Sequence, residues 1–138
     1  MVHPQTTFIA CHFANLDYDL TRLGKLFDHN RKLYADISAR YAETAPIPRF
    51  ASQFYAEHSD RLLYETDMGF DEPMYRVTFR ILESMDEHFY ETEQFDYHWS
   101  LNGFGLPDST LQRVFHHNNA GKILAFGTRQ TMVKSARV

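Results

Sequence analysis

Residues 60–68 read Asp-Arg-Leu-Leu-Tyr-Glu-Thr-Asp-Met, a short apolar run that ends in a polar cluster. The apolar run over 61–64 is typical of a buried strand, and the polar residues that follow it are typical of a loop. Two further runs, 6–11 and 33–37, have the same character, and the first lacks the in-out alternation of a half-exposed strand. The sequence therefore predicts three short strands, the first of them buried on both faces.

Amphipathic patterns separate these strands. Apolar residues recur at helical spacing, and prolines stand near the first turn of two of the segments concerned. The predicted helices cover residues 17–28, 49–58, 74–89 and 106–124. An alternation of strands and helices is what right-handed βαβ crossovers produce, with parallel strands buried under helices. The predicted fold class is therefore α/β.

The bulk composition excludes several classes of protein. A chain of 138 residues has the size of one domain, and a net charge of −4 lacks the basic excess of nucleic-acid binding proteins. Cys11 is the single cysteine, so an intramolecular disulfide is impossible. The N-terminus has no apolar stretch long enough for a signal peptide or a membrane span. We expect a cytoplasmic protein with no nucleic-acid or membrane partner.

Polar side chains follow each predicted strand, where parallel α/β folds bind their ligands. His12 follows the first strand, Ser38 to Arg40 follow the second, and Asp67 follows the third. Imidazole and carboxylate together suit a divalent metal and the water that it activates. The simpler alternatives stay open: His12 as a hydrogen-bonded histidine at a strand end, and Asp67 as a helix cap or loop carboxylate.

Other polar residues are weaker candidates. Asp36 lies inside an apolar run, where an ionised carboxylate is costly unless paired. Support of the site stays open as one role for it, and a structural pair with Arg40 is the role that we expect. A nucleophilic pair of Cys11 with its neighbour His12 is disfavoured because adjacent residues of a strand point to opposite faces. Neighbouring histidines on the last helix, at 116 and 117, point about 100° apart, which is poor geometry for sharing one metal.

Three segments resemble the amidohydrolase-related proteins, which are metal-dependent hydrolases of the amidohydrolase superfamily. They are Phe-Ile-Ala-Cys-His at 8–12, Leu-Tyr-Ala-Asp-Ile-Ser-Ala-Arg at 33–40, and the stretch 60–68 quoted above. The segment Asn-Asn-Ala-Gly-Lys-Ile-Leu at 118–124 also resembles the final helix of that family. The resemblance runs roughly from residue 4 to residue 124.

This resemblance implies a fold and roles for two residues. The fold would be the C-terminal part of a (β/α)8 TIM-type barrel, strands six to eight with their helices, over residues 1–127, followed by a loose tail over 128–138. His12 would be the sixth-strand histidine and Asp67 the eighth-strand aspartate, both of them catalytic and both ligands of a divalent metal, zinc in the first instance. The family's His-x-His pair and its fifth-strand histidine have no counterpart in these 138 residues.

Two functions follow as hypotheses. In the first, the chain is the C-terminal part of a metal-dependent hydrolase, or of a related decarboxylase, that acts on a small-molecule substrate. In the second, it is a non-catalytic half-barrel remnant whose open strand edge pairs with another polypeptide or with a second copy, giving a homo-oligomer.

Overall fold

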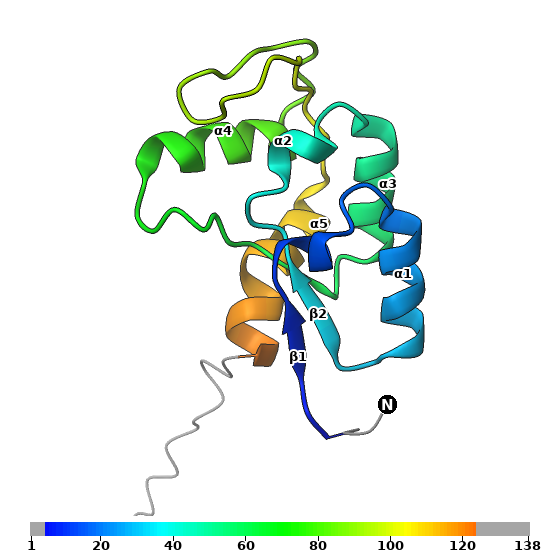
Figure 1. The fold of residues 1–138 in the computed structure, drawn as a ribbon. Coiled ribbons are helices and arrows are strands. Elements are labelled where there is room, and N and C mark those ends of the chain that lie inside the picture. The colour runs from blue at the N-terminus through cyan, green and yellow to red at the C-terminus, as the bar shows by residue number, and fades with distance from the viewer. Residues whose placement is uncertain (1–4, 124–138) are drawn as a thin grey trace, which may run out of the picture.

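The computed structural model describes residues 5–123, which form a three-stranded sheet with helices packed around it (Figure 1). The strands are β1 (Phe8–Ala10), β2 (Leu33–Asp36) and β3 (Leu62–Leu63). The helices are η1 (His12–Asn15), α1 (Leu20–His29), α2 (Tyr41–Thr44), α3 (Pro48–Glu57), α4 (Glu72–Glu83), α5 (Asp108–Gln112) and the π-helical segment η2 (Arg113–Ile123). The predicted tail over 128–138 lies outside the described residues.

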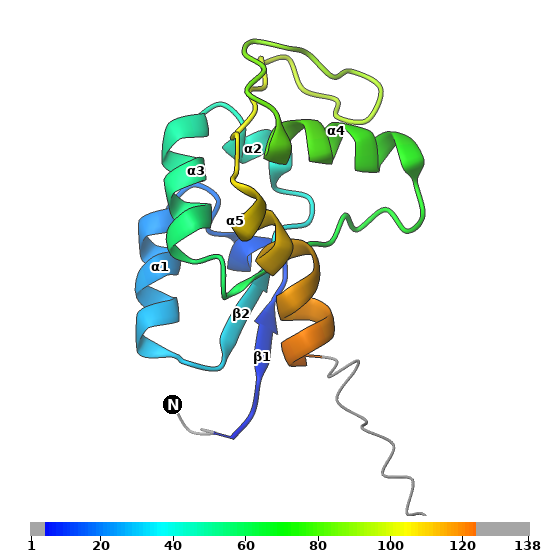
Figure 2. The same cartoon turned by 180° about the vertical axis from the view of Figure 1, so that it is seen from behind.

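The sheet is parallel, in the order β1-β2-β3. Helices α1 and α3 lie side by side on one side of the sheet, whereas α5 and η2 lie on the other (Figures 1 and 2). The α1–α3 contact includes stacked rings of Phe27 and Phe54, 6.4 Å apart. The predicted parallel α/β arrangement is confirmed, and Pro48 opens α3 as expected because a first-turn proline loses no helical hydrogen bond.

The prediction of strands six to eight of a (β/α)8 barrel is wrong. The described residues form an open sheet of three strands, of which the longest has four residues. Closure of such a barrel needs eight tilted strands. Here a later segment of the chain, η2, covers the edge of the sheet at β3. The N–H of Tyr64, which follows β3, donates to the carbonyl of Val114 in η2 (3.1 Å). A helical segment therefore stands beside β3, and the fold is a small mixed α/β structure.

The prediction that the first strand is buried on both faces is also wrong. Phe8 is 42% exposed and Ile9 is 45% exposed. Within residues 5–123, β1 lies at the edge of the sheet and pairs with one strand, β2. A continuous apolar run indicates burial only if elements pack on both faces, and β1 lacks such cover among residues 5–123.

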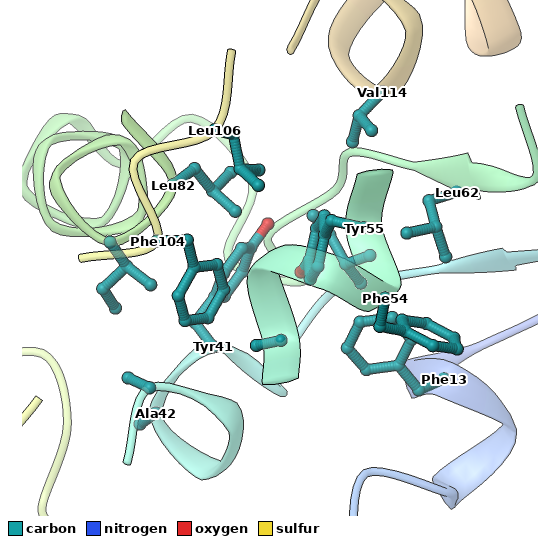
Figure 3. Close-up of a cluster of buried hydrophobic side chains, with 14 of the residues drawn as sticks. Phe13, Tyr41, Ala42, Phe54, Tyr55, Leu62, Leu82, Phe104, Leu106 and Val114 are labelled. Carbon is teal, nitrogen blue, oxygen red and sulfur yellow. The ribbon is translucent and has the colours of Figure 1, made fainter. Parts of the chain in front are cut away.

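The core lies between the sheet and the helices and is rich in aromatic rings (Figure 3). Phe13 is fully buried and meets Phe54 and Tyr55 edge-on, with ring centroids 6.1 and 5.9 Å away. Edge-to-face pairs of this kind stabilise a core beyond the apolar area that they bury. The hydroxyl of Tyr55 is buried without a hydrogen-bond partner in the described part of the chain, and burial raises the pKa of this phenol.

Helix α4 ends at Glu83, six residues before the predicted end, because the returning chain binds its last turn. The N–H groups of Phe104 and Leu106 donate to the carbonyls of Ile81 and Leu82 (2.7 and 3.0 Å). A side chain at Gly103 would overlap the carbonyl of Ser84, so glycine permits this approach. Within residues 5–123, none of the helices has the length and apolar character needed to cross a membrane.

Candidate active site

The loops that follow the three strands meet at the carboxyl edge of the sheet, toward which the arrowheads point in Figure 1. His12 opens η1 after β1, Ser38 follows β2, and Asp67 follows β3. The structure brings the two predicted site residues together: His12 Nε2 lies 3.8 Å from Asp67 Oδ2. The side chain of Asp67 is 62% exposed and that of His12 is 30% exposed, so the pair faces outward from the sheet edge.

The ring of His12 is held in one tautomer by Ser38. The Ser38 hydroxyl donates to Asp36 Oδ1 (2.5 Å), so its oxygen can only accept from His12 Nδ1, which lies 2.9 Å away. The carbonyl of Ser38, 3.2 Å from the same nitrogen, is also an acceptor. Nδ1 therefore carries the proton whenever the ring is neutral, and Nε2, which lies nearest to Asp67, is the nitrogen that can take up a second one. This is the form in which an imidazole acts as a base or binds a metal.

The expected pairing of Asp36 with Arg40 is wrong, and the carboxylate instead binds the loops that carry the site. Besides the Ser38 hydroxyl, Asp36 Oδ1 accepts from the backbone N–H of His12 (2.8 Å) and of Ser38 (3.2 Å). The hydrogen bond to this carboxylate also raises the pKa of the exposed Cys11 thiol. The side chain of Arg40 instead binds those of Asp17, Glu43 and Asn15. A buried carboxylate thus ties the loop after β1 to the loop after β2.

The thiol of Cys11 is a poor candidate nucleophile. A raised pKa favours the protonated thiol, whereas the thiolate is the reactive form. His116 and His117 face each other on η2 with ring centroids 5.8 Å apart, and both are exposed. Neither of these alternatives contributes to the group around His12 and Asp67.

The backbone of these three loops is strained. Residues His12–Asn15 all have φ between 54° and 57°, Ala39 has φ of 51° and Asp67 has φ of 64°. They are six of the seven non-glycine residues with positive φ in the described ranges. This left-handed conformation costs an L-residue roughly 1–2 kcal/mol. Such strain persists where the surrounding contacts impose it, and it clusters at functional sites.

A cavity of about 180 Å³ opens beside Asp67. Its wall comes from the loops after β2 and β3, from α2 and α4, and from residues 94–97 of the segment between α4 and α5. The lining residues are Ala39, Tyr41, Ala42, Glu43, Thr66, Asp67, Met68, Met74, Gln94, Phe95 and Tyr97. The sequence did not reveal this wall, although the aromatic spacing of Phe95, Tyr97 and Trp99 was the available signal.

Tyr97 docks the segment between α4 and α5 onto α2. Its hydroxyl donates to Glu43 Oε1 (2.7 Å), and this hydrogen bond is the main reason why the pKa of Tyr97 is raised to about 12. The ring of Tyr97 stacks on Trp99 at 4.2 Å, and Trp99 Nε1 donates to the carbonyl of Ala42 (3.0 Å). The aromatic wall of the cavity is therefore held by hydrogen bonds to α2.

The described residues do not by themselves complete the predicted zinc centre. Two ligands on one tetrahedral zinc lie about 3.3 Å apart, so the His12–Asp67 spacing is close to suitable. A catalytic zinc, however, usually has three protein ligands, and residues 5–123 contain no group of three histidine, cysteine or acidic side chains that could hold a metal. The donor set of the described part of the chain is thus one ligand short.

We expect the 138-residue chain to bind zinc weakly. Calorimetric titration with zinc chloride should give no tight one-to-one uptake, because two ligands hold a metal poorly. The His12→Gln variant should lose most of whatever binding remains, whereas His117→Gln should behave as the parent chain does. Tight stoichiometric binding by the parent chain would contradict this expectation.

No protein-family model, no curated protein and no solved structure matches this chain. The resemblance to the amidohydrolase-related proteins stays a prediction. The function is therefore inferred from the chemistry of the site around His12 and Asp67.

Proposed function

We propose that the loops at the carboxyl edge of the sheet form an acid–base active site that acts on a small organic molecule, by hydrolysis or by the related decarboxylation. His12 and Asp67 are the residues that carry the chemistry. The observation that supports this proposal most directly is the hydrogen bond that keeps a proton on His12 Nδ1, which leaves Nε2, 3.8 Å from the Asp67 carboxylate, as the nitrogen that exchanges a proton. The same reaction class is implied by the resemblance to amidohydrolase-related proteins.

Each group has a defined role. Nε2 of neutral His12 accepts a proton from the attacking water or from the substrate, and returns it to the leaving group. Nδ1 keeps its proton throughout, because the oxygens of Ser38 accept a hydrogen bond from this N–H. The Asp67 carboxylate stabilises the imidazolium that forms, and the strained loops hold both groups in place before substrate arrives. A metal, which would supply Lewis-acid chemistry, needs ligands beyond those two.

A cytoplasmic location belongs to the same proposal. The chain has a single cysteine and therefore gains no intramolecular disulfide from an oxidising compartment.

The Asp67→Asn variant tests the proposal. We expect turnover of p-nitrophenyl esters, lactones and simple amides to fall by about 10²-fold or more, because the imidazolium loses its counter-charge. The fold should remain intact, since the side chain of Asp67 is mostly exposed. Circular dichroism and thermal unfolding check the fold, and steady-state kinetics check the turnover. Asp28→Asn, which removes an exposed carboxylate from α1, is the matched control.

A double variant sharpens the test. If His12 and Asp67 act as one unit, His12→Gln with Asp67→Asn should be no slower than the slower single variant. Undiminished turnover in folded Asp67→Asn, or fully multiplicative losses in the double variant, would contradict the proposed pairing.

The open edge of β1 favours a second candidate function, assembly with a second copy of the chain. The N–H of Phe8 donates to the carbonyl of Lys32, the residue before β2 (2.9 Å). Because backbone groups of successive residues point to opposite sides, those of Ile9 point to the open side. The side chains of Phe8 and Ile9 are exposed and apolar. A shallow hollow beside them is lined by residues 8–10, Asn30 and Leu33. Two-fold pairing would set β1 antiparallel to its copy.

Light scattering and native mass spectrometry test the assembly. We expect a concentration-dependent dimer in the parent chain and a monomer in Ile9→Lys, because a lysine at a strand edge opposes edge pairing. Leu26→Lys, at an exposed apolar position of α1, is the control and should dimerise as the parent does. A parent chain that stays monomeric up to millimolar concentration would exclude this function.

A further inference from the structure

We propose that the cavity beside Asp67 binds a small molecule with a protonated amine, and that it disfavours carboxylates. This inference rests on the proposed function and narrows it by naming the class of substrate. The features that carry it are the negative charge of the cavity wall, the incomplete compensation of one of its carboxylates, and the aromatic rings that line it.

Carboxylates are the ionised groups of the described cavity wall. Glu43 and Asp67 line it, together with the hydroxyl-bearing Tyr41 and Tyr97, whereas lysine, arginine and histidine are absent from the described lining. Both phenols are neutral near pH 7, since burial raises the pKa of Tyr41 and the hydrogen bond to Glu43 raises that of Tyr97 to about 12. A bound cation therefore meets acceptors and negative charge, whereas a bound carboxylate meets repulsion.

Glu43 has hydrogen-bonding capacity left over. Its Oε1 accepts from the Tyr97 hydroxyl (2.7 Å) and from Arg40 Nη1 (3.3 Å). Its Oε2 is buried and has no donor within residues 5–123. Arg40 does not neutralise the wall alone, because it is shared with Asp17 (3.1 Å). A buried carboxylate oxygen without a donor is costly. The charge of Glu43 is therefore only partly compensated, and it favours a cation in the cavity that this residue lines.

Aromatic rings complete the recognition of a cation. Tyr41, Phe95 and Tyr97 line the same cavity, and ring faces attract cations through their quadrupole. The stack of Tyr97 on Trp99 keeps its ring in place. The volume of about 180 Å³ also limits the ligand. An engineered cavity of roughly 150 Å³ holds benzene, so a single ring with a short amine arm fits here.

This chemistry distinguishes the two reactions proposed above. The substrate of a decarboxylase carries a carboxylate. In this cavity it would lie near Glu43 and Asp67, and no lysine, arginine or histidine of the described lining would balance its charge. The substrate of a hydrolase needs no such charge. An amine-bearing ester, lactone or amide is therefore the substrate class that fits the cavity.

Binding of three aromatic probes of similar size tests the inference without any turnover. Benzylammonium and benzyl alcohol differ in charge but little in shape, and benzoate is an anion of similar size. Chemical-shift titration of the ¹⁵N-labelled 138-residue chain measures each affinity. We expect benzylammonium to bind at least about tenfold more tightly than benzoate, a difference of about 1.4 kcal/mol. Its largest shifts should fall on Glu43, Phe95 and Tyr97.

Two variants and a control define the outcome. Glu43→Gln and, separately, Asp67→Asn should weaken benzylammonium several-fold and leave benzyl alcohol unchanged, whereas Glu87→Gln at an exposed site should change neither. If Glu43→Gln fails to fold, the affinity of Asp67→Asn for benzylammonium alone decides the result. Benzoate binding as tightly as benzylammonium, or shifts confined to other surfaces, would overturn the inference. The proposed function would still stand if turnover depended on His12, because that test uses kinetics and this one uses binding.

Discussion

Asp36→Ala is expected to lower the free energy of unfolding by about 2–5 kcal/mol and to abolish activity in the remaining folded protein. Asp36 Oδ1 accepts from the backbone N–H groups of His12 and Ser38 and from the Ser38 hydroxyl. Alanine leaves these donors without their acceptor in a largely buried place, and each lost partner costs about 1–3 kcal/mol. The free Ser38 hydroxyl can then donate to His12 Nδ1, which removes the constraint on the tautomer.

Chemical denaturation and ¹⁵N spectra of the imidazole check both halves of this expectation. The slope of the transition should stay unchanged, and the nitrogen shifts of His12 should report a mixture of tautomers. Asp36→Asn is the matched comparison, since its amide oxygen keeps an acceptor in the same place and should recover much of the stability. An Asp36→Ala protein as stable as its parent would mean that the carboxylate does not hold the two loops together.

Phe13→Ala should cost about 3–5 kcal/mol of stability, a large share of the roughly 5–15 kcal/mol that stabilises a typical domain. Phe13 is fully buried and packs edge-on against Phe54 and Tyr55 of α3. It also lies one residue after His12, within the left-handed turn. Its burial therefore offsets the strain of the turn that carries the proposed base, and removing the ring should loosen His12 as well.

Thermal and urea unfolding measure this loss, and two controls isolate its cause. Phe70→Ala deletes the same ring from a fully exposed position and should change the stability by less than about 0.5 kcal/mol. Phe13→Leu keeps most of the buried volume and should cost less than the alanine variant. Equal effects of the alanine substitutions at 13 and 70 would show that the turn is not anchored by its burial.

Local patterns were sufficient to predict the elements but not their lengths. The strands at 33–37 and 61–64 and the helix after Pro48 were predicted within a few residues of β2, β3 and α3. Helix α4 was predicted too long, because the backbone of residues 103–106 binds its last turn and no local pattern indicates that contact. The π-helical form of η2 likewise had no local signal.

For the site, the sequence predicted which strand ends are polar, and the structure places His12 and Asp67 3.8 Å apart. Their convergence follows from topology, since parallel neighbouring strands place their carboxyl ends at one edge. The sequence favoured the wrong partner for Asp36 and missed the wall formed by residues 94–97. Both depend on side chains that reach across the fold, over 24 residues from Asp36 to His12 and over 54 from Glu43 to Tyr97.

The sequence by itself determined the strand–helix alternation, the parallel sheet and the polar strand ends, because these follow from periodicity and from the handedness of βαβ crossovers. Only the tertiary structure decided that the sheet is open, that β1 is its exposed edge and that His12 has one tautomer. The physical reason is the range of the contacts. Burial and hydrogen-bond partners are set by residues distant along the chain, and a local pattern contains no record of which residues these are.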